Sequence, residues 1–116
     1  MVENNLSKKI ADFADKSLLI VDDDNPFRER LARAMEKKGF SVTQAESVKS
    51  GINSVKIKKP AFAVIDLRLG DGNGLEVVKE INKSKDNKVS SRIIMLTGYG
   101  NIPTAVAAIK EGAIDY

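Results

Sequence analysis

The chain has 116 residues, 42% of them hydrophobic and 30% charged, so it is long enough for one globular domain with a buried core. It contains no cysteine and no histidine, which excludes disulfides, thiolate- or histidine-ligated metal sites and catalysis by a Ser-His-Asp triad. The net charge of +3 is too small to indicate nucleic-acid binding, and without a membrane-length apolar run or a signal peptide we expect a cytoplasmic protein with no membrane partner.

The first half of the chain predicts two strands, each followed by a helix. Residues 18–21 (LLIV) are continuously apolar, as in a strand buried on both faces. The helix expected over 25–39 has a proline in its first turn and places its apolar residues at helical spacing, at Phe27, Leu31, Ala34 and Met35. Residues 40–45 (FSVTQA) alternate like a strand with one polar face. The helix expected over 48–59 carries Val48, Ile52 and Val55.

The second half repeats this alternation of buried strand and helix. Residues 61–65 (AFAVI) predict a strand, and a glycine-rich turn over 67–74 leads into a helix over 75–81. The run 93–96 (IIML) predicts a further buried strand, and apolar residues at helical spacing predict a helix over 102–109. Repeated strand–helix units with buried strands indicate an α/β domain with a doubly wound parallel sheet, covered by helices on both faces.

Polar residues follow directly on three of the predicted buried strands. They are Asp22, Asp23 and Asp24 after the first strand, Asp66 after the second, and Thr97 after the third. The carboxyl ends of the strands in a parallel sheet meet at one edge, where functional sites form. We therefore expect these side chains to gather at that edge.

Clustered carboxylates cannot all stay charged without compensation. Either a proton is shared between them, as in acid–base dyads, or a hard cation binds. Because the chain offers oxygen ligands and no histidine or cysteine, magnesium (Mg2+) is the favoured cation. Magnesium beside a lone carboxylate suits phosphoryl transfer onto Asp66, with Thr97 offering a hydroxyl to the phosphoryl group. Asp24 and Asn25 are interpreted as caps of the following helix.

Four motifs resemble the receiver domains of bacterial two-component response regulators: VDDD at 21–24, IDLRLGDGNGLEV at 65–77, LTGYGN at 96–101 and KEGAIDY at 110–116. The resemblance covers residues 18–116. The stretches RLARAMEKKGF, AESV and DLRLGDGNGLEVV further resemble the RegA/PrrA/ActR subgroup. The resemblance implies a flavodoxin-like receiver fold with strand order 2-1-3-4-5 over residues 17–116, preceded by an N-terminal extension over residues 1–16.

The resemblance also implies a role for each site residue. Asp66 matches the phosphoacceptor, and the predicted ligands of Mg2+ are Asp22, Asp23, Asp66 and the backbone carbonyl of Arg68. Thr97 matches the hydroxyl that contacts the phosphoryl group, and Tyr116 matches the aromatic side chain that switches with it. The implied function is to accept a phosphoryl group from a sensor histidine kinase and to control an output, which we expect to be transcription. The resemblance implies no enzymatic activity beyond self-phosphorylation and self-dephosphorylation. It also implies that the chain can form a homodimer.

The sequence departs from the family pattern at its end. It stops before the Lys-Pro pair, the last strand and helix, and any DNA-binding domain, so we expect a domain that is incomplete at the C-terminus. DNA would then be contacted only through an output domain outside this chain. A stand-alone receiver that acts by protein contacts remains an alternative. A phosphatase of the haloacid dehalogenase type is disfavoured, because it needs a second aspartate as general acid where this chain has Arg68.

Overall fold

The computed structural model describes residues 15–83 and 91–96. In chain order its elements are β1 (Ser17–Val21), α2 (Asn25–Lys37), β2 (Ser41–Ala45), α3 (Val48–Ile57), β3 (Phe62–Asp66), β4 (Arg68–Leu69), β5 (Gly72–Asn73), α4 (Leu75–Lys83) and β6 (Arg92–Leu96). The strands and helices predicted within these ranges are confirmed, and their ends differ by at most two residues. The strand at 93–96 is not buried on both faces as predicted, because Ile94 is 44% exposed. The helix predicted over 102–109 lies outside the described residues.

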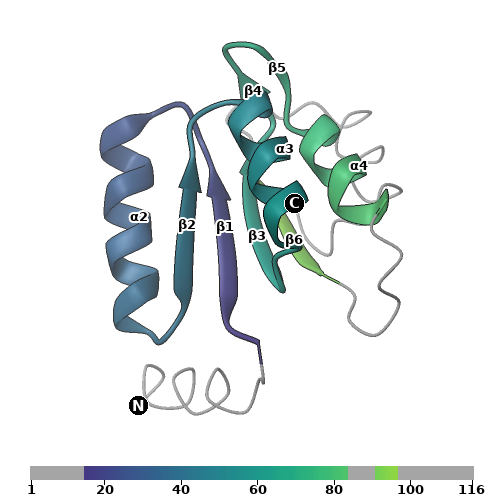
Figure 1. Ribbon diagram of the computed structural model, residues 1–116. Helices are drawn as coiled ribbons and strands as arrows, with labels where there is room; N and C mark the ends of the chain where they lie inside the picture. Colours follow the sequence, from purple (N-terminus) through teal and green to yellow (C-terminus); the bar gives the residue numbers. More distant parts are fainter. Residues whose placement is uncertain (1–14, 84–90, 97–116) are drawn as a thin grey trace.

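The main sheet has the order β2-β1-β3-β6, and every neighbouring pair is parallel (Figure 1). This order confirms the predicted arrangement of strands as far as the described residues extend. The register pairs Leu19 of β1 with Thr43 on one side and with Ala63 on the other. Because β1 and β3 lie next to each other in register, their carboxyl ends come together at one edge of the sheet.

Helices cover both faces of this sheet. Leu19 and Val21 of β1 pack into the cluster beneath α3 and α4, whereas Leu18 and Ile20 pack into the cluster beneath α2. Burial on both faces explains why residues 18–21 are continuously apolar, and each such side chain contributes roughly 1.5–3 kcal/mol of transfer free energy. In the described ranges, no helix is both long and apolar enough to cross a membrane.

The buried face of α2 agrees with the predicted one only in part. The apolar spacing placed Phe27 and Ala34 on the inner face, but Phe27 is 39% exposed and Ala34 is exposed as well. Arg28 and Ala32 are buried instead. Leu31 and Met35 pack against the core as predicted. The buried Arg28 guanidinium donates from Nη1 to the carbonyl oxygen of Asp22 at 2.8 Å.

The start of α2 is set by Asp24. Its Oδ1 accepts a hydrogen bond from the backbone N–H of Phe27 at 3.1 Å, which makes Asp24 the N-cap and confirms that interpretation. The interpretation of Asn25 as a cap is wrong, because Asn25 is already the first helical residue. Its side-chain oxygen accepts from Nη1 of Arg28 at 2.7 Å instead.

Candidate metal centre

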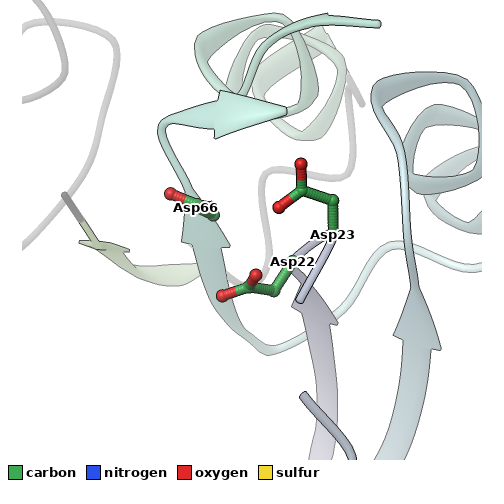
Figure 2. A group of neighbouring side chains, drawn as sticks. All are labelled: Asp22, Asp23 and Asp66. Carbon is green, nitrogen blue, oxygen red and sulfur yellow. The ribbon is translucent and has the colours of Figure 1, made fainter. Parts of the chain in front are cut away.

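Three carboxylates converge at the carboxyl ends of two neighbouring strands. Asp22 and Asp23 follow β1 directly, and Asp66 is the last residue of β3, which pairs with β1 through Val21 and Ile65. One oxygen from each of the three carboxylates lies within 4.8 Å of the other two (Figure 2). The predicted gathering of Asp22, Asp23 and Asp66 is therefore confirmed. Thr97 and Tyr116 lie outside the described residues, so their roles stay predictions.

Asp22 is the deepest of the three carboxylates and is only 5% exposed. Its Oδ1 accepts from the backbone N–H of Asp24 at 2.9 Å, and its own N–H donates to the carbonyl oxygen of Ala45 at 3.1 Å. These bonds hold both the side chain and the backbone of Asp22. Asp23 is exposed and Asp66 is partly buried, so the cluster opens toward solvent on the side of Asp23.

Arg28 is a buried cation behind this cluster that sequence reasoning missed. It is 8% exposed, and its Nη1 donates both to the carbonyl oxygen of Asp22 and to Oδ1 of Asn25. Its Nε donates to Oε1 of Gln44 at 3.0 Å. The bonds fix the turn that carries Asp22 and Asp23. The predicted stripe gave no signal for Arg28, because that residue lies beside the predicted apolar positions of the helix.

The chain after Asp66 folds back as a short hairpin, which the sequence predicted only as a glycine-rich turn. Oδ1 of Asp66 accepts from the backbone N–H of Arg68 at 3.3 Å. Arg68 and Leu69 form β4, which pairs antiparallel with β5. The base of the hairpin is closed by the N–H of Gly74, which donates to the carbonyl oxygen of Leu67 at 2.8 Å. The backbone of Arg68 thus lies beside the Asp66 carboxylate, while ligation of a metal by its carbonyl stays a prediction.

Gly74 is required where this hairpin meets α4. A β-carbon at position 74 would collide with the backbone oxygen of Asp66 and would lie 2.9 Å from Cγ2 of Ile65. We expect Gly74→Ala to lower the free energy of unfolding by about 1–3 kcal/mol, as overpacking does, because backbone must move to admit the methyl group. Urea unfolding measures this loss.

Gly70 in the same hairpin provides the matched control for that substitution. A β-carbon at position 70 has no heavy atom within 4 Å, so Gly70→Ala should leave stability nearly unchanged. Equal stability of the Gly74→Ala and Gly70→Ala variants would contradict the close approach between Gly74 and the Asp66 backbone.

Two of the clustered carboxylates, Asp66 and Asp22, have raised pKa values. Burial raises the pKa of Asp66, and the negative charge of Asp22 raises it further. Burial also raises the pKa of Asp22, with the charges of Asp23 and Asp24 adding to the effect. Crowded, partly desolvated carboxylate oxygens without nitrogen or sulfur ligands suit a small hard cation, and the residues present therefore fit magnesium.

Removing one of these charges should stabilise the fold when no metal is present. We expect Asp66→Asn to raise the free energy of unfolding in EDTA at pH 7 by up to about 1 kcal/mol, the scale of partly exposed charge interactions. Because the folded-state pKa of Asp66 is raised, its ionised form destabilises the fold above that pKa. The advantage of the asparagine variant should therefore shrink as the pH falls through the raised pKa. Urea unfolding at several pH values measures the difference, and a constant difference would contradict the assigned repulsion.

The protein is an α/β domain, because its parallel sheet is covered by helices on both faces. Three carboxylates at the carboxyl ends of the strands form a candidate site for a hard cation. The chain belongs to the response regulator receiver domain family, whose sequence pattern it matches over residues 18–116.

Relatives of known function narrow this assignment. The chain is 61% identical over 102 residues to the acid tolerance regulatory protein ActR of Sinorhizobium medicae, a match that covers 88% of the chain and 51% of ActR. It is 58% identical over 103 residues to the photosynthetic apparatus regulatory protein RegA of Rhodobacter capsulatus, covering 89% of the chain and 54% of RegA. The predicted resemblance to this subgroup is confirmed. The chain spans about half the length of these relatives.

A solved structure supports the fold assignment. A response regulator from Burkholderia pseudomallei, crystallised with a phosphorylated aspartic acid, a calcium ion and citrate, superposes with a TM-score of 0.78. The two sequences are 37% identical, and the match covers 88% of this chain and 58% of that protein. The flavodoxin-like receiver fold expected from the motifs is thereby confirmed.

Proposed function

We propose that this chain accepts a phosphoryl group on the carboxylate of Asp66 and passes the resulting change in conformation to an output. The observation that carries the proposal is the position of Asp66 at the end of β3, where its carboxylate lies within 4.8 Å of those of Asp22 and Asp23. The relative from Burkholderia pseudomallei supports it, because that protein was crystallised with a phosphorylated aspartic acid and a calcium ion.

The proposed reaction uses the Asp66 carboxylate as nucleophile. One carboxylate oxygen of Asp66 bonds to phosphorus while a bond in the phosphodonor breaks. That bond is the P–N bond of a phosphohistidine on a sensor kinase, or the P–O bond of a small acyl phosphate. The leaving imidazole or carboxylate departs with the electron pair of the broken bond. Asp22, Asp23 and the Arg68 carbonyl, together with Asp66, would hold magnesium, which when bound neutralises the phosphoryl oxygens. The hydrogen bond from the Arg68 N–H orients the Asp66 carboxylate.

The proposed switch involves residues outside the described ranges. The Thr97 hydroxyl would donate to the phosphoryl group, and the Tyr116 ring would change position with it. In the sheet, Leu96 of β6 pairs with Asp66 of β3. Thr97 is the residue that follows Leu96 in the chain. Phosphorylation adds charge and acceptor oxygens at this edge, which favours a loop position that can donate to them.

We further propose the context in which the domain works. Residues 17–116 form the receiver domain and residues 1–16 its N-terminal extension. The protein is cytoplasmic, and it is a signalling domain with no reaction beyond gaining and losing its own phosphoryl group. The names of the relatives support control of transcription. DNA contact would then belong to a part of such proteins outside the matched residues, and phosphorylation would act on it directly or by promoting a homodimer.

The test is phosphorylation of the whole chain by acetyl phosphate or a phosphorylated histidine kinase. We expect one phosphoryl group per chain, seen by intact mass spectrometry, with magnesium present and little or none in EDTA. The label should be released by base, as an acyl phosphate is. A label that forms equally well in EDTA would overturn the proposal.

A further inference from the structure

Asp71, at the tip of the β4–β5 hairpin, binds the first turn of α3. One carboxylate oxygen accepts from the backbone N–H of Val48 at 2.8 Å, and the other accepts from the N–H of Lys49 at 3.1 Å. These are the first two residues of α3, whose amides have no partner within the helix. Both bonds lower the pKa of Asp71, with the bond from Val48 the larger cause, so the carboxylate is charged at neutral pH.

The helix has a local cap of its own besides this contact. Oγ of Ser47 accepts from the N–H of Ser50 at 3.0 Å, and Oγ of Ser50 accepts from the N–H of Ser47 at 3.1 Å, which forms a capping box. The bonds of Asp71 differ because they join residues 23 and 22 positions apart in the chain. They attach the hairpin to the helix, and Figure 1 shows the two side by side.

The hairpin that Asp71 anchors also carries Arg68, whose backbone carbonyl is a proposed ligand of magnesium. At the base of the hairpin, the N–H of Leu67 donates to the carbonyl oxygen of Leu96 at 2.9 Å. The N–H of Gly74 donates to the carbonyl oxygen of Leu67. At its tip, Asp71 holds it to α3. Arg68 lies between these two attachments, and its N–H reaches the Asp66 carboxylate. Release of the tip would remove one of the attachments that hold the backbone of Arg68, whereas the base of the hairpin and the buried side chain of Leu69 would still hold it.

We propose that Asp71 is a positioning residue for the metal site, which fixes the Arg68 carbonyl by tying the hairpin tip to the start of α3. The inference rests on the proposed function, because it assumes that the Arg68 carbonyl ligates magnesium. Its physical basis is that groups orienting a metal ligand affect affinity even though they do not touch the metal.

The test compares two substitutions at the same helix terminus. Asp71→Ala removes the attachment of the hairpin, whereas Ser47→Ala removes a cap of α3 and leaves the hairpin contacts in place. The dissociation constant for magnesium is measured on the whole chain by isothermal titration calorimetry, and stability is measured by urea unfolding. Both variants should lose stability. Only Asp71→Ala should lose magnesium affinity, by about tenfold, at the lower end of the range for groups that orient a ligand.

A conservative variant separates positioning from a general loss of structure. Asp71→Asn keeps one acceptor oxygen, so it should retain one of the two amide bonds and an affinity between those of the wild type and Asp71→Ala. Unchanged affinity in both Asp71 variants, or an equal loss in Ser47→Ala, would overturn the inference alone. A wild-type chain that binds no magnesium would overturn the proposed function and this inference with it.

Discussion

Asp66→Asn is expected to abolish phosphorylation of the chain. The amide has no anionic oxygen to attack phosphorus, and the remaining carboxylates are placed differently. Asp22 is buried and accepts the N–H of Asp24, and Asp24 caps α2. Asp66 instead ends β3 with its carboxylate partly exposed beside the other two. Acetyl phosphate with magnesium should label the wild type and leave the variant at background by intact mass spectrometry.

Asp24→Asn is the matched control for this loss. It makes the same chemical change two residues from Asp22, at a carboxylate outside the cluster, and asparagine caps helices as well as aspartate does. The control should be labelled to the same extent as the wild type. A base-labile label that persists in Asp66→Asn would place the phosphoacceptor elsewhere and would sink the assignment.

Asp23→Asn is expected to weaken magnesium binding at least about tenfold, or about 1.4 kcal/mol. Magnesium keeps several water ligands and takes only a few anionic protein oxygens, so the loss of one is costly. Asp23 is the exposed member of the cluster, within 4.8 Å of both Asp22 and Asp66, and neutralising it should disturb packing little. Calorimetric titration at about 0.15 M salt, where charges at a distance are screened, measures the change.

Asp24→Asn again provides the comparison. It removes the same charge from the adjacent residue, but the Asp24 side chain points into the first turn of α2, where it accepts the N–H of Phe27. The affinity of this variant for magnesium should stay within about twofold of the wild type, because the Asp24 carboxylate is not one of the three that cluster and asparagine keeps its bond to the Phe27 N–H. Equal losses from the two substitutions would mean that affinity follows total charge and that Asp23 has no special place in the site.

The amino-acid sequence determined the sheet and the carboxylate cluster. Continuous apolar runs predicted the strands at 18–21, 61–65 and 93–96, and each run stops at a polar residue. Parallel strands bring such stops to one edge, so the meeting of Asp22, Asp23 and Asp66 follows from local pattern and sheet geometry alone. The motifs added the predicted roles, because they resemble those of the receiver domain family, to which the chain belongs.

Only the tertiary structure decided what surrounds the cluster. Helical spacing placed Leu31 and Met35 correctly on the inner face of α2. It did not show that Phe27 is exposed and that Arg28 is buried, with a hydrogen bond to the Asp22 carbonyl. Asp71 read as one more polar residue in a glycine-rich turn, yet it binds helix amides 23 and 22 residues earlier in the chain. Contacts of this kind depend on how separate elements dock. Local periodicity carries no information about them, because it reports only which face of an element is apolar.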